Sequence, residues 1–127
     1  MESRSGPADI VWMGDSRQVL RDWPEDIRAS MGQSLRLLQH GLPAALDVRP
    51  MQSIGQGVFE LKDADESAWY RLIYLARIED RLYILDCFTK SSRKTARNDL
   101  DTAKMRLARV KQQLREEHRN AKRKSSN

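Results

Sequence analysis

The fold is decided between Val58 and Thr95, which read VFELKDADESAWYRLIYLARIEDRLYILDCFTKSSRKT. Three apolar runs in this stretch are strand-like, at about 58–62, 69–77 and 81–88, and short charged connections separate them. Connections this short favour consecutive antiparallel strands over helical crossovers. The stretch therefore predicts an antiparallel meander.

Basic side chains occur at defined points of these runs. Lys62 ends the first run, Arg71 lies inside the second and Lys90 follows the third. Because a strand alternates its side chains between two faces, the second run has two rows. One row holds Trp69, Arg71, Ile73 and Leu75, and the other holds Tyr70, Leu72 and Tyr74. Arg71 is thus expected in an otherwise apolar row, where the sheet fixes its place.

Helical patterns lie on both sides of the predicted meander. Before it, residues 10–13 read as a short strand, a helical turn follows Asp15, and apolar residues then recur at helical spacing: Ile27, Met31, Leu35 and Leu38. After it, an apolar seam marks a long, otherwise basic helix: Leu100, Ala103, Leu107, Val110 and Leu114. The predicted class is α+β, with N-terminal helices and a long C-terminal helix packed on a small, mainly antiparallel sheet. We expect a single domain over 1–127, with a flexible lead-in at 1–8 and a mobile basic tail at 120–127.

Charge is distributed unevenly along the chain. Residues 1–87 carry 10 Lys and Arg against 14 Asp and Glu, whereas residues 88–127 carry 13 against 4. Positive charge this concentrated attracts polyanions and makes nucleic-acid binding dependent on salt. The C-terminal third is therefore the expected docking surface for a polyanion, and charge alone does not identify which polyanion it is.

Neither a metal nor a membrane is expected from the sequence. Cys87 is single, and His40 and His118 are far apart, so zinc-ligand spacing is absent and no cofactor is predicted. No apolar stretch approaches the roughly 20 residues of a membrane span, and no signal pattern opens the chain. A cytoplasmic protein is the default expectation.

RNA cleavage is the chemistry that these cations fit. When the 2′-hydroxyl of RNA attacks its own phosphate, one group accepts a proton, another protonates the leaving oxygen, and cations stabilise the charge. Arg71 stays protonated and is a candidate stabiliser, whereas Lys62, Lys90 or Lys94 are candidate proton carriers. Three structural interpretations stay open: a strand-end lysine is often a solvated charge, Arg71 can be an ion-pair partner of Glu60 or Asp86, and residues 91–95 can be a polar loop without a role in catalysis.

Three motifs carry a family resemblance. In order, they are GQGVFELK at 55–62, WYRLIYLA at 69–76 and ILDCFTKSSRKT at 84–95. Together with the flanking helices, they resemble the RelE/ParE toxin superfamily, and most of all its HigB-like, phage-derived branch. The resemblance implies a microbial ribonuclease fold and places Lys62 at the ELR-type arginine, Arg71 at the YR arginine, and Phe88 and Lys90 in the F-x-K segment, with Lys94 as a further basic position.

The resemblance implies the toxin of a type II toxin–antitoxin system, a metal-independent, ribosome-dependent endoribonuclease that cuts mRNA. Its partners would be mRNA, the ribosome and a cognate helix-turn-helix antitoxin, with a higher-order toxin–antitoxin complex as a further expectation. The expected catalytic residues are Lys62, Arg71 and Lys90, and the expected RNA-binding residues are Phe88, Arg93, Lys94 and Tyr74. Two alternatives stay open: a ParE-like inhibitor of DNA gyrase and a non-catalytic nucleic-acid-binding module.

Overall fold

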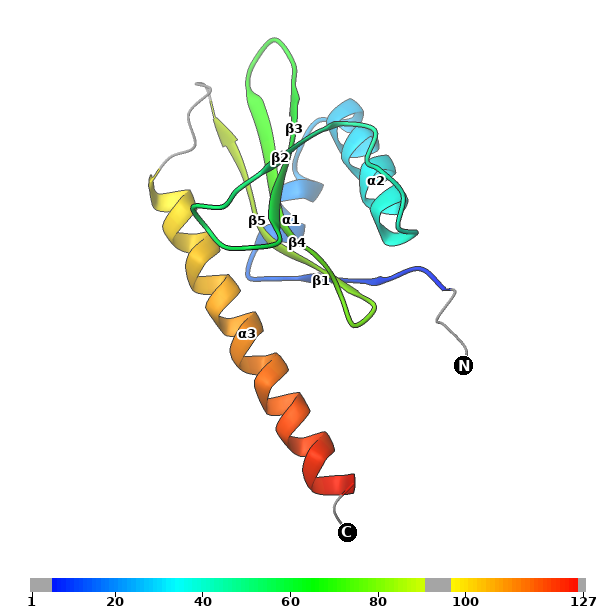
Figure 1. The fold of residues 1–127 in the computed structure, drawn as a ribbon. Coiled ribbons are helices and arrows are strands. Elements are labelled where there is room, and N and C mark those ends of the chain that lie inside the picture. Colours follow the sequence, from blue (N-terminus) through cyan, green and yellow to red (C-terminus); the bar gives the residue numbers. More distant parts are fainter. Residues whose placement is uncertain (1–5, 91–96, 126–127) are drawn as a thin grey trace.

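The α+β fold predicted from the sequence is confirmed in the computed structural model, which describes residues 6–90 and 97–125 (Figure 1). The elements follow in this order: β1 (Asp9–Trp12), α1 (Ser16–Arg21), α2 (Glu25–Gln39), β2 (Asp47–Pro50), β3 (Val58–Ala64), β4 (Trp69–Ile78), β5 (Arg81–Lys90) and α3 (Arg97–Ser125). Within the described ranges, none of the helices has a stretch apolar enough to cross a membrane.

The five strands form one sheet in the order β1-β5-β4-β3-β2. Strands β2 to β5 pair antiparallel, and β1 adds to β5 in parallel. The central meander of β3, β4 and β5 is therefore confirmed. Its second turn is a two-residue hairpin at Glu79 and Asp80, whose φ angles of 49° and 66° suit the right-handed twist of the flanking strands.

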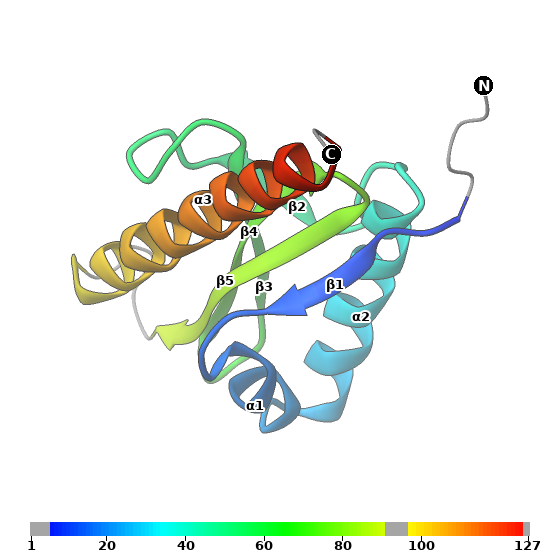
Figure 2. The same cartoon turned by 90° about the horizontal axis from the view of Figure 1, so that it is seen from below.

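Helices cover the sheet on opposite faces, with α1 and α2 on one side and α3 on the other (Figure 2). The face toward α2 buries the following apolar residues: Trp23, Ile27, Met31 and Leu35 of the helical layer against Leu61, Leu72, Tyr74, Leu82 and Ile84 of the strands. The face toward α3 buries a second set: Ala103, Leu107 and Val110 against Val58, Ile73, Leu75, Tyr83, Leu85 and Phe88. Because both faces are covered, the middle strands are apolar on both sides, as the alternation in β4 predicted.

Parts of the two terminal segments belong to the described structure. Ala8, assigned to the flexible lead-in, is buried, and its N–H donates to the carbonyl of Gln39 over 2.9 Å. Residues 120–125, expected as a mobile tail, continue α3 to Ser125. Alanine, lysine and arginine are strong helix formers, so they extend the helix despite the polar composition of this segment.

Candidate functional site

Four of the predicted site residues meet on one face of the sheet. In the strand register, Lys62 of β3 lies opposite Arg71 of β4, and Arg71 lies opposite Phe88 of β5. Trp69 and Lys90 form the next pair along the same face. Side chains opposite each other on adjacent strands have Cβ atoms about 5 Å apart, so these residues are neighbours. We call Lys62, Trp69, Arg71, Phe88 and Lys90 the cross-strand cluster.

A β-bulge in β5 brings Phe88 and Lys90 to this face. Ile73 is paired with Asp86, and the next residue of β4 is paired with Ile84, so Leu85 is an extra residue in β5. Strict alternation would place Phe88 on the α2 side together with Ile84, yet Phe88 packs on the α3 side. Bulges redirect side chains in this way and occur often beside functional sites.

Arg71 is buried within the cluster. Its side chain is 1% exposed, and its Nη1 atom lies 3.3 Å from Oε2 of Glu60, which is also 1% exposed. A buried charge is costly unless a partner compensates it, and Glu60 is that partner. Of the two acidic partners considered from the sequence, the structure thus pairs Arg71 with Glu60. The guanidinium is held in a fixed place inside the protein.

The two lysines of the cluster are more accessible than Arg71. Lys62 is partly exposed, and its Nζ atom lies 5.1 Å from the centroid of the Trp69 ring, at cation–π range. The Lys90 side chain is 26% exposed, and its Nζ atom lies 3.4 Å from Oδ2 of Asp99 in the first turn of α3. Both amines therefore reach solvent, while Trp69 restricts the position of the Lys62 side chain and Asp99 restricts that of Lys90.

Arg106 of α3 connects the bulge to the segment between β1 and α1. Its Nη1 atom donates to the carbonyl of Leu85 over 2.9 Å and to Oδ1 of Asp86 over 3.2 Å, and its Nη2 atom donates to Oδ1 of Asp15 over 3.2 Å. Asp15 is the N-cap residue of α1 but makes no side-chain capping hydrogen bond there. Arg106 thus fixes the bulge against α3.

Asp86 is a buried carboxyl group at this contact. Its pKa is raised to about 7, mainly by burial. The positive charge of Arg106 opposes this rise, and the carboxylates of Asp99 and Asp15 add to it. Its Oδ2 atom has no hydrogen-bond partner in the part of the chain that the structure describes. Asp86 therefore changes its charge near neutral pH, two residues before Phe88 in the same strand.

Sequence reasoning missed the Arg106 contact. One signal was present: Arg106 lies three residues after Ala103 and four before Val110, a spacing that places it beside the apolar seam of α3. A basic residue at such a position often binds a specific partner. Its partners could not be deduced, because Asp15 and Asp86 are 91 and 20 residues away in the sequence.

Tyr74 does not join the cluster, so its expected contact with RNA has no support at this surface. It lies on the α2 side of the sheet, is 3% exposed and stacks on Phe59 with ring centroids 5.8 Å apart. Burial raises the pKa of its hydroxyl to about 12. Phe88 does join the cluster, but at 7% exposure its ring packs in the α3-side core and presents little surface on which a base could stack.

The other expected RNA-binding residues, Arg93 and Lys94, lie outside the described residues. Within the described ranges, no group of three His, Cys, Asp or Glu side chains is placed so that it could hold a metal ion.

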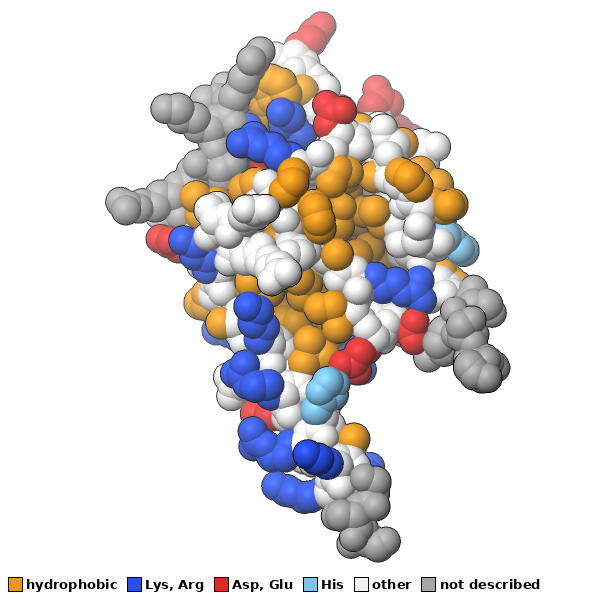
Figure 3. Space-filling view, in the orientation of Figure 1, with side chains coloured by type: hydrophobic (Ala, Val, Ile, Leu, Met, Phe, Trp, Pro, Cys, Tyr) orange, Lys and Arg blue, Asp and Glu red, His pale blue; other side chains and the backbone are white. Residues whose placement is uncertain are grey.

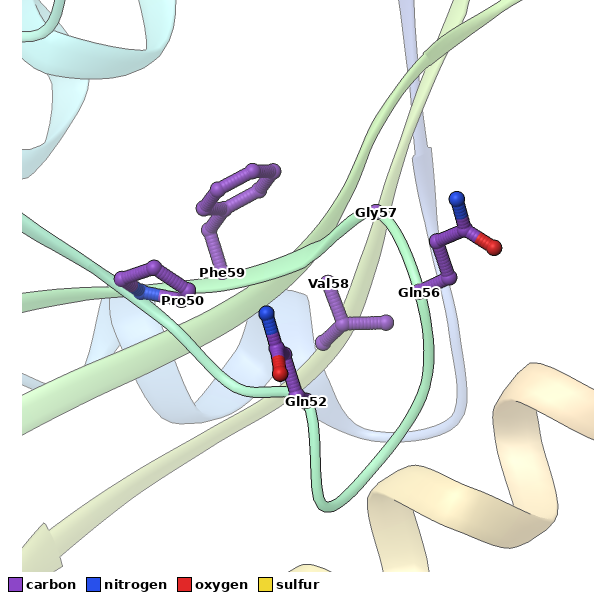
Figure 4. A pocket seen from close by; sticks show the side chains of 6 residues that line it. All are labelled: Pro50, Gln52, Gln56, Gly57, Val58 and Phe59. Atoms are coloured by element: carbon purple, nitrogen blue, oxygen red, sulfur yellow. The ribbon is translucent and has the colours of Figure 1, made fainter.

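An open pocket lies elsewhere, beside the loop between β2 and β3 (Figure 4). Its lining residues are Pro50, Gln52, Gln56, Gly57, Val58 and Phe59, none of which titrates. Lys62 is four residues from Val58 in the same strand, which is about 13 Å at the rise of a β-strand. The pocket is therefore separate from the cross-strand cluster and brings no acid–base group to it.

The fold and the cluster define a small α+β protein whose sheet holds a buried arginine and two accessible lysines beneath one covering helix. Residues 18–108 match the family described as Phage derived protein Gp49-like (DUF891), and the chain belongs to this family. The match includes β2 to β5, the whole cross-strand cluster and Arg106. No curated protein matches the chain significantly.

Proposed function

We propose that this protein is the toxin of a type II toxin–antitoxin system and that it cleaves mRNA on the translating ribosome. Its family supports this assignment, because Gp49-like proteins are grouped with RelE- and HigB-like toxins. The observation that carries the proposal is the register of β3, β4 and β5, which places Lys62, Arg71 and Lys90 on one face.

The geometry suggests different roles for the three cations. The 2′-hydroxyl of the substrate attacks the adjacent phosphorus, its proton passes to a base, and the leaving 5′-oxygen receives a proton from an acid. Lys62 and Lys90 have the accessible amines and are the candidates for contact with the phosphate and for proton transfer. Arg71 supplies a permanent positive charge that Glu60 orients and partly offsets.

Substrate binding would compete with one existing ion pair. Asp99 holds Lys90 in a partly exposed pair, and such pairs contribute only about 0–1 kcal/mol. An RNA phosphate can replace this carboxylate at little cost. Lys90 is therefore held near its working position before RNA arrives.

A cognate antitoxin of the helix-turn-helix type is the proposed partner, acting in the cytoplasm. A chain with 13 basic and 4 acidic residues after Cys87 favours a partner that offers acidic side chains, because complementary charge accelerates association. A larger toxin–antitoxin assembly would follow if the antitoxin itself dimerises.

The decisive experiment is translation of a reporter mRNA with purified protein, followed by mapping of the new 5′ ends. We expect discrete cleavage sites that disappear without ribosomes. Lys62→Met and Lys90→Met should each reduce the cleavage rate by about 100-fold, the usual cost of losing one charge-stabilising group. Arg36→Gln, which removes an exposed arginine of α2, is the control and should cleave normally.

Two results would overturn the proposal. If the message stays intact at protein levels that stop growth, and supercoiled DNA is broken in a reaction that needs gyrase, the protein inhibits gyrase instead. If growth continues at high protein levels without an antitoxin, the protein only binds nucleic acid.

A further inference from the structure

Helix α3 is longer than its packing on the sheet requires. It has 29 residues, or about 43 Å at 1.5 Å per residue. Its contacts with the hairpin turn of β4 and β5 come late in the helix, where Glu117 accepts from Arg81 over 2.9 Å and His118 pairs with Glu79 over 2.7 Å. Side chains 119–124 after these contacts are all exposed, and this end of α3 extends beyond the sheet (Figure 1).

A line of cations runs along one flank of this helix. Five exposed residues are spaced by seven, four, four and three positions: Lys104, Lys111, Arg115, Arg119 and Lys122. Because successive residues of an α-helix are rotated by about 100°, these five side chains fall within a sector of about 80° around the helix axis. Ala108 lies in the same sector, in the seven-residue interval between Lys104 and Lys111. No acidic residue between 104 and 122 falls in this sector. We call these five residues the α3 basic stripe.

The stripe follows one side of a continuous helix and is accessible. From residue 104 to residue 122 it spans about 27 Å, with cations about one or two helical turns apart. It lies about 100° around the helix from the buried seam of Ala103, Leu107 and Val110, so the sheet does not cover it. The space-filling view shows Lys and Arg side chains gathered along the part of α3 that extends beyond the sheet (Figure 3).

We propose that the α3 basic stripe is a docking surface for double-stranded RNA and binds its phosphate backbone without reading its sequence. A regular line of cations fits the RNA backbone, which carries one negative charge at each phosphate. An acidic protein, the proposed antitoxin included, is a poorer fit to these five residues, because protein interfaces depend on apolar and aromatic anchors and the stripe offers only Ala108. The antitoxin is therefore expected to use the other basic residues after Cys87. Single-stranded RNA is also a poorer fit, since it is bound largely by aromatic stacking, and no Phe, Trp or Tyr follows Phe88 in the chain.

This inference deepens the proposed function and rests on it for the choice of RNA. The cross-strand cluster would act on the message, while the stripe would bind structured RNA and hold the protein on its substrate. Four of the five stripe residues lie beyond residue 108, where the match to the Gp49-like family ends. The docking surface therefore lies mainly in the part of α3 that follows the matched residues.

The test measures binding without cleavage. A fluorescein-labelled RNA duplex of about 20 base pairs with blunt ends is titrated with the full chain between roughly 50 and 200 mM KCl, and binding is followed by fluorescence anisotropy. The stripe variant carries Lys111→Gln, Arg115→Gln and Arg119→Gln. The matched control carries Arg109→Gln, Arg123→Gln and Lys124→Gln, which removes the same charge from other sides of α3. Glutamine keeps helix propensity, and circular dichroism verifies that α3 is intact.

We expect the stripe variant to bind the duplex at least about tenfold more weakly at the lower salt concentration. The slope of log K against log salt should fall by about 2 to 3, because each lost phosphate contact contributes about 0.9. The control should change the slope by less than about 1. Equal losses in both variants, or no loss in either, would overturn the inference.

Two further results separate this inference from the proposed function. Duplex binding that depends on the stripe in a protein that never cleaves mRNA would support the docking surface and count against the toxin activity. Normal cleavage with unchanged duplex binding in the stripe variant would overturn the docking surface alone. Displacement of the duplex by poly-glutamate at equal charge concentration would also overturn it, because the stripe would then favour acidic protein as much as RNA.

Discussion

Gly14 and Arg106 lie so close together that a Cβ atom on residue 14 would overlap the guanidinium of Arg106. Gly14 also has a φ of +55°, a left-handed conformation that side chains disfavour. The glycine between β1 and α1 is therefore needed for two reasons. It allows the backbone to turn, and it leaves room for the arginine that contacts Leu85 and Asp86 at the bulge.

Gly14→Ala should lower the free energy of unfolding by about 1–2 kcal/mol, because the backbone is strained and Arg106 must move away from its partners. Urea denaturation measures this change. Gly32→Ala is the matched control: nothing lies within 4 Å of its added Cβ, and alanine within helix α2 should raise stability by about 0.5–1 kcal/mol. If Gly14→Ala lowers the free energy of unfolding by the same amount in an Arg106→Ala background, the close approach to Arg106 does not contribute to the destabilisation.

The pairing of Glu60 with Arg71 yields a second prediction. Arg71→Ala removes the guanidinium that pairs with the Glu60 carboxylate, which is 1% exposed, and should destabilise the protein by about 3–5 kcal/mol. Loss of cleavage in this variant would not separate folding from chemistry. The double variant Glu60→Leu, Arg71→Met removes both charges and should recover most of the stability.

Cleavage by this double variant then tests Arg71 itself. If the buried guanidinium stabilises charge on the reacting phosphate, the rate should stay at least about tenfold below that of the unaltered protein despite a normal unfolding midpoint. Urea denaturation and the reporter assay are carried out on the same preparation. A stable double variant with full activity would show that Arg71 has a structural role only.

Alternation along the strands predicted much of this site. It placed Arg71 in a row with Ile73 and Leu75, and both now pack on the α3 side. The same alternation placed Tyr74 in the opposite row, so its separation from Arg71 could be deduced from the sequence, although we included it among the expected RNA-binding residues. A strand pattern thus predicts which residues share a face wherever the strand is regular.

The part that could not be predicted depends on one inserted residue. Phe88 and Lys90 share the face of Arg71 only because Leu85 is extra in β5, and no glycine or proline in ILDCF marks that bulge. Arg106 stabilises the bulge from a helix that begins 12 residues after it at residue 97. Such long-range contacts are set by tertiary packing and leave little local pattern in the sequence.

Asp86 predicts a characteristic dependence of stability on pH. Its pKa in the folded protein is about 7, above the ordinary value of 3.8, so the folded state binds the proton more tightly than the unfolded chain does. Its contribution to stability is complete below about pH 4 and is lost as the pH rises toward 7. Three pKa units correspond to about 4 kcal/mol, as an order of magnitude.

Asp86→Asn should therefore flatten the stability profile between about pH 4 and 7 and should unfold at higher urea concentration than the unaltered protein at about pH 8. The amide oxygen can still accept from Arg106, so the contact across the bulge is kept. Asp101→Asn, at an exposed position on α3, is the control and should leave the profile unchanged. A profile that stays steep in Asp86→Asn would assign the pH dependence to another group.

The ion pair between Lys90 and Asp99 yields the final prediction. Asp99→Asn removes the carboxylate that lies 3.4 Å from the Lys90 amine and that competes with an RNA phosphate for it. Because this pair is partly exposed, the free energy of unfolding should fall by less than about 1 kcal/mol. The KM for mRNA cleavage should fall by roughly three- to fivefold, the equivalent of about 1 kcal/mol of binding, while kcat stays within about twofold. Lys90→Met combined with Asp99→Asn should lose this gain, because the phosphate then has no amine to bind at this position.

An unchanged KM in Asp99→Asn would mean that Lys90 does not contact the substrate, and the proposed site would then depend on Lys62 alone for its accessible cation.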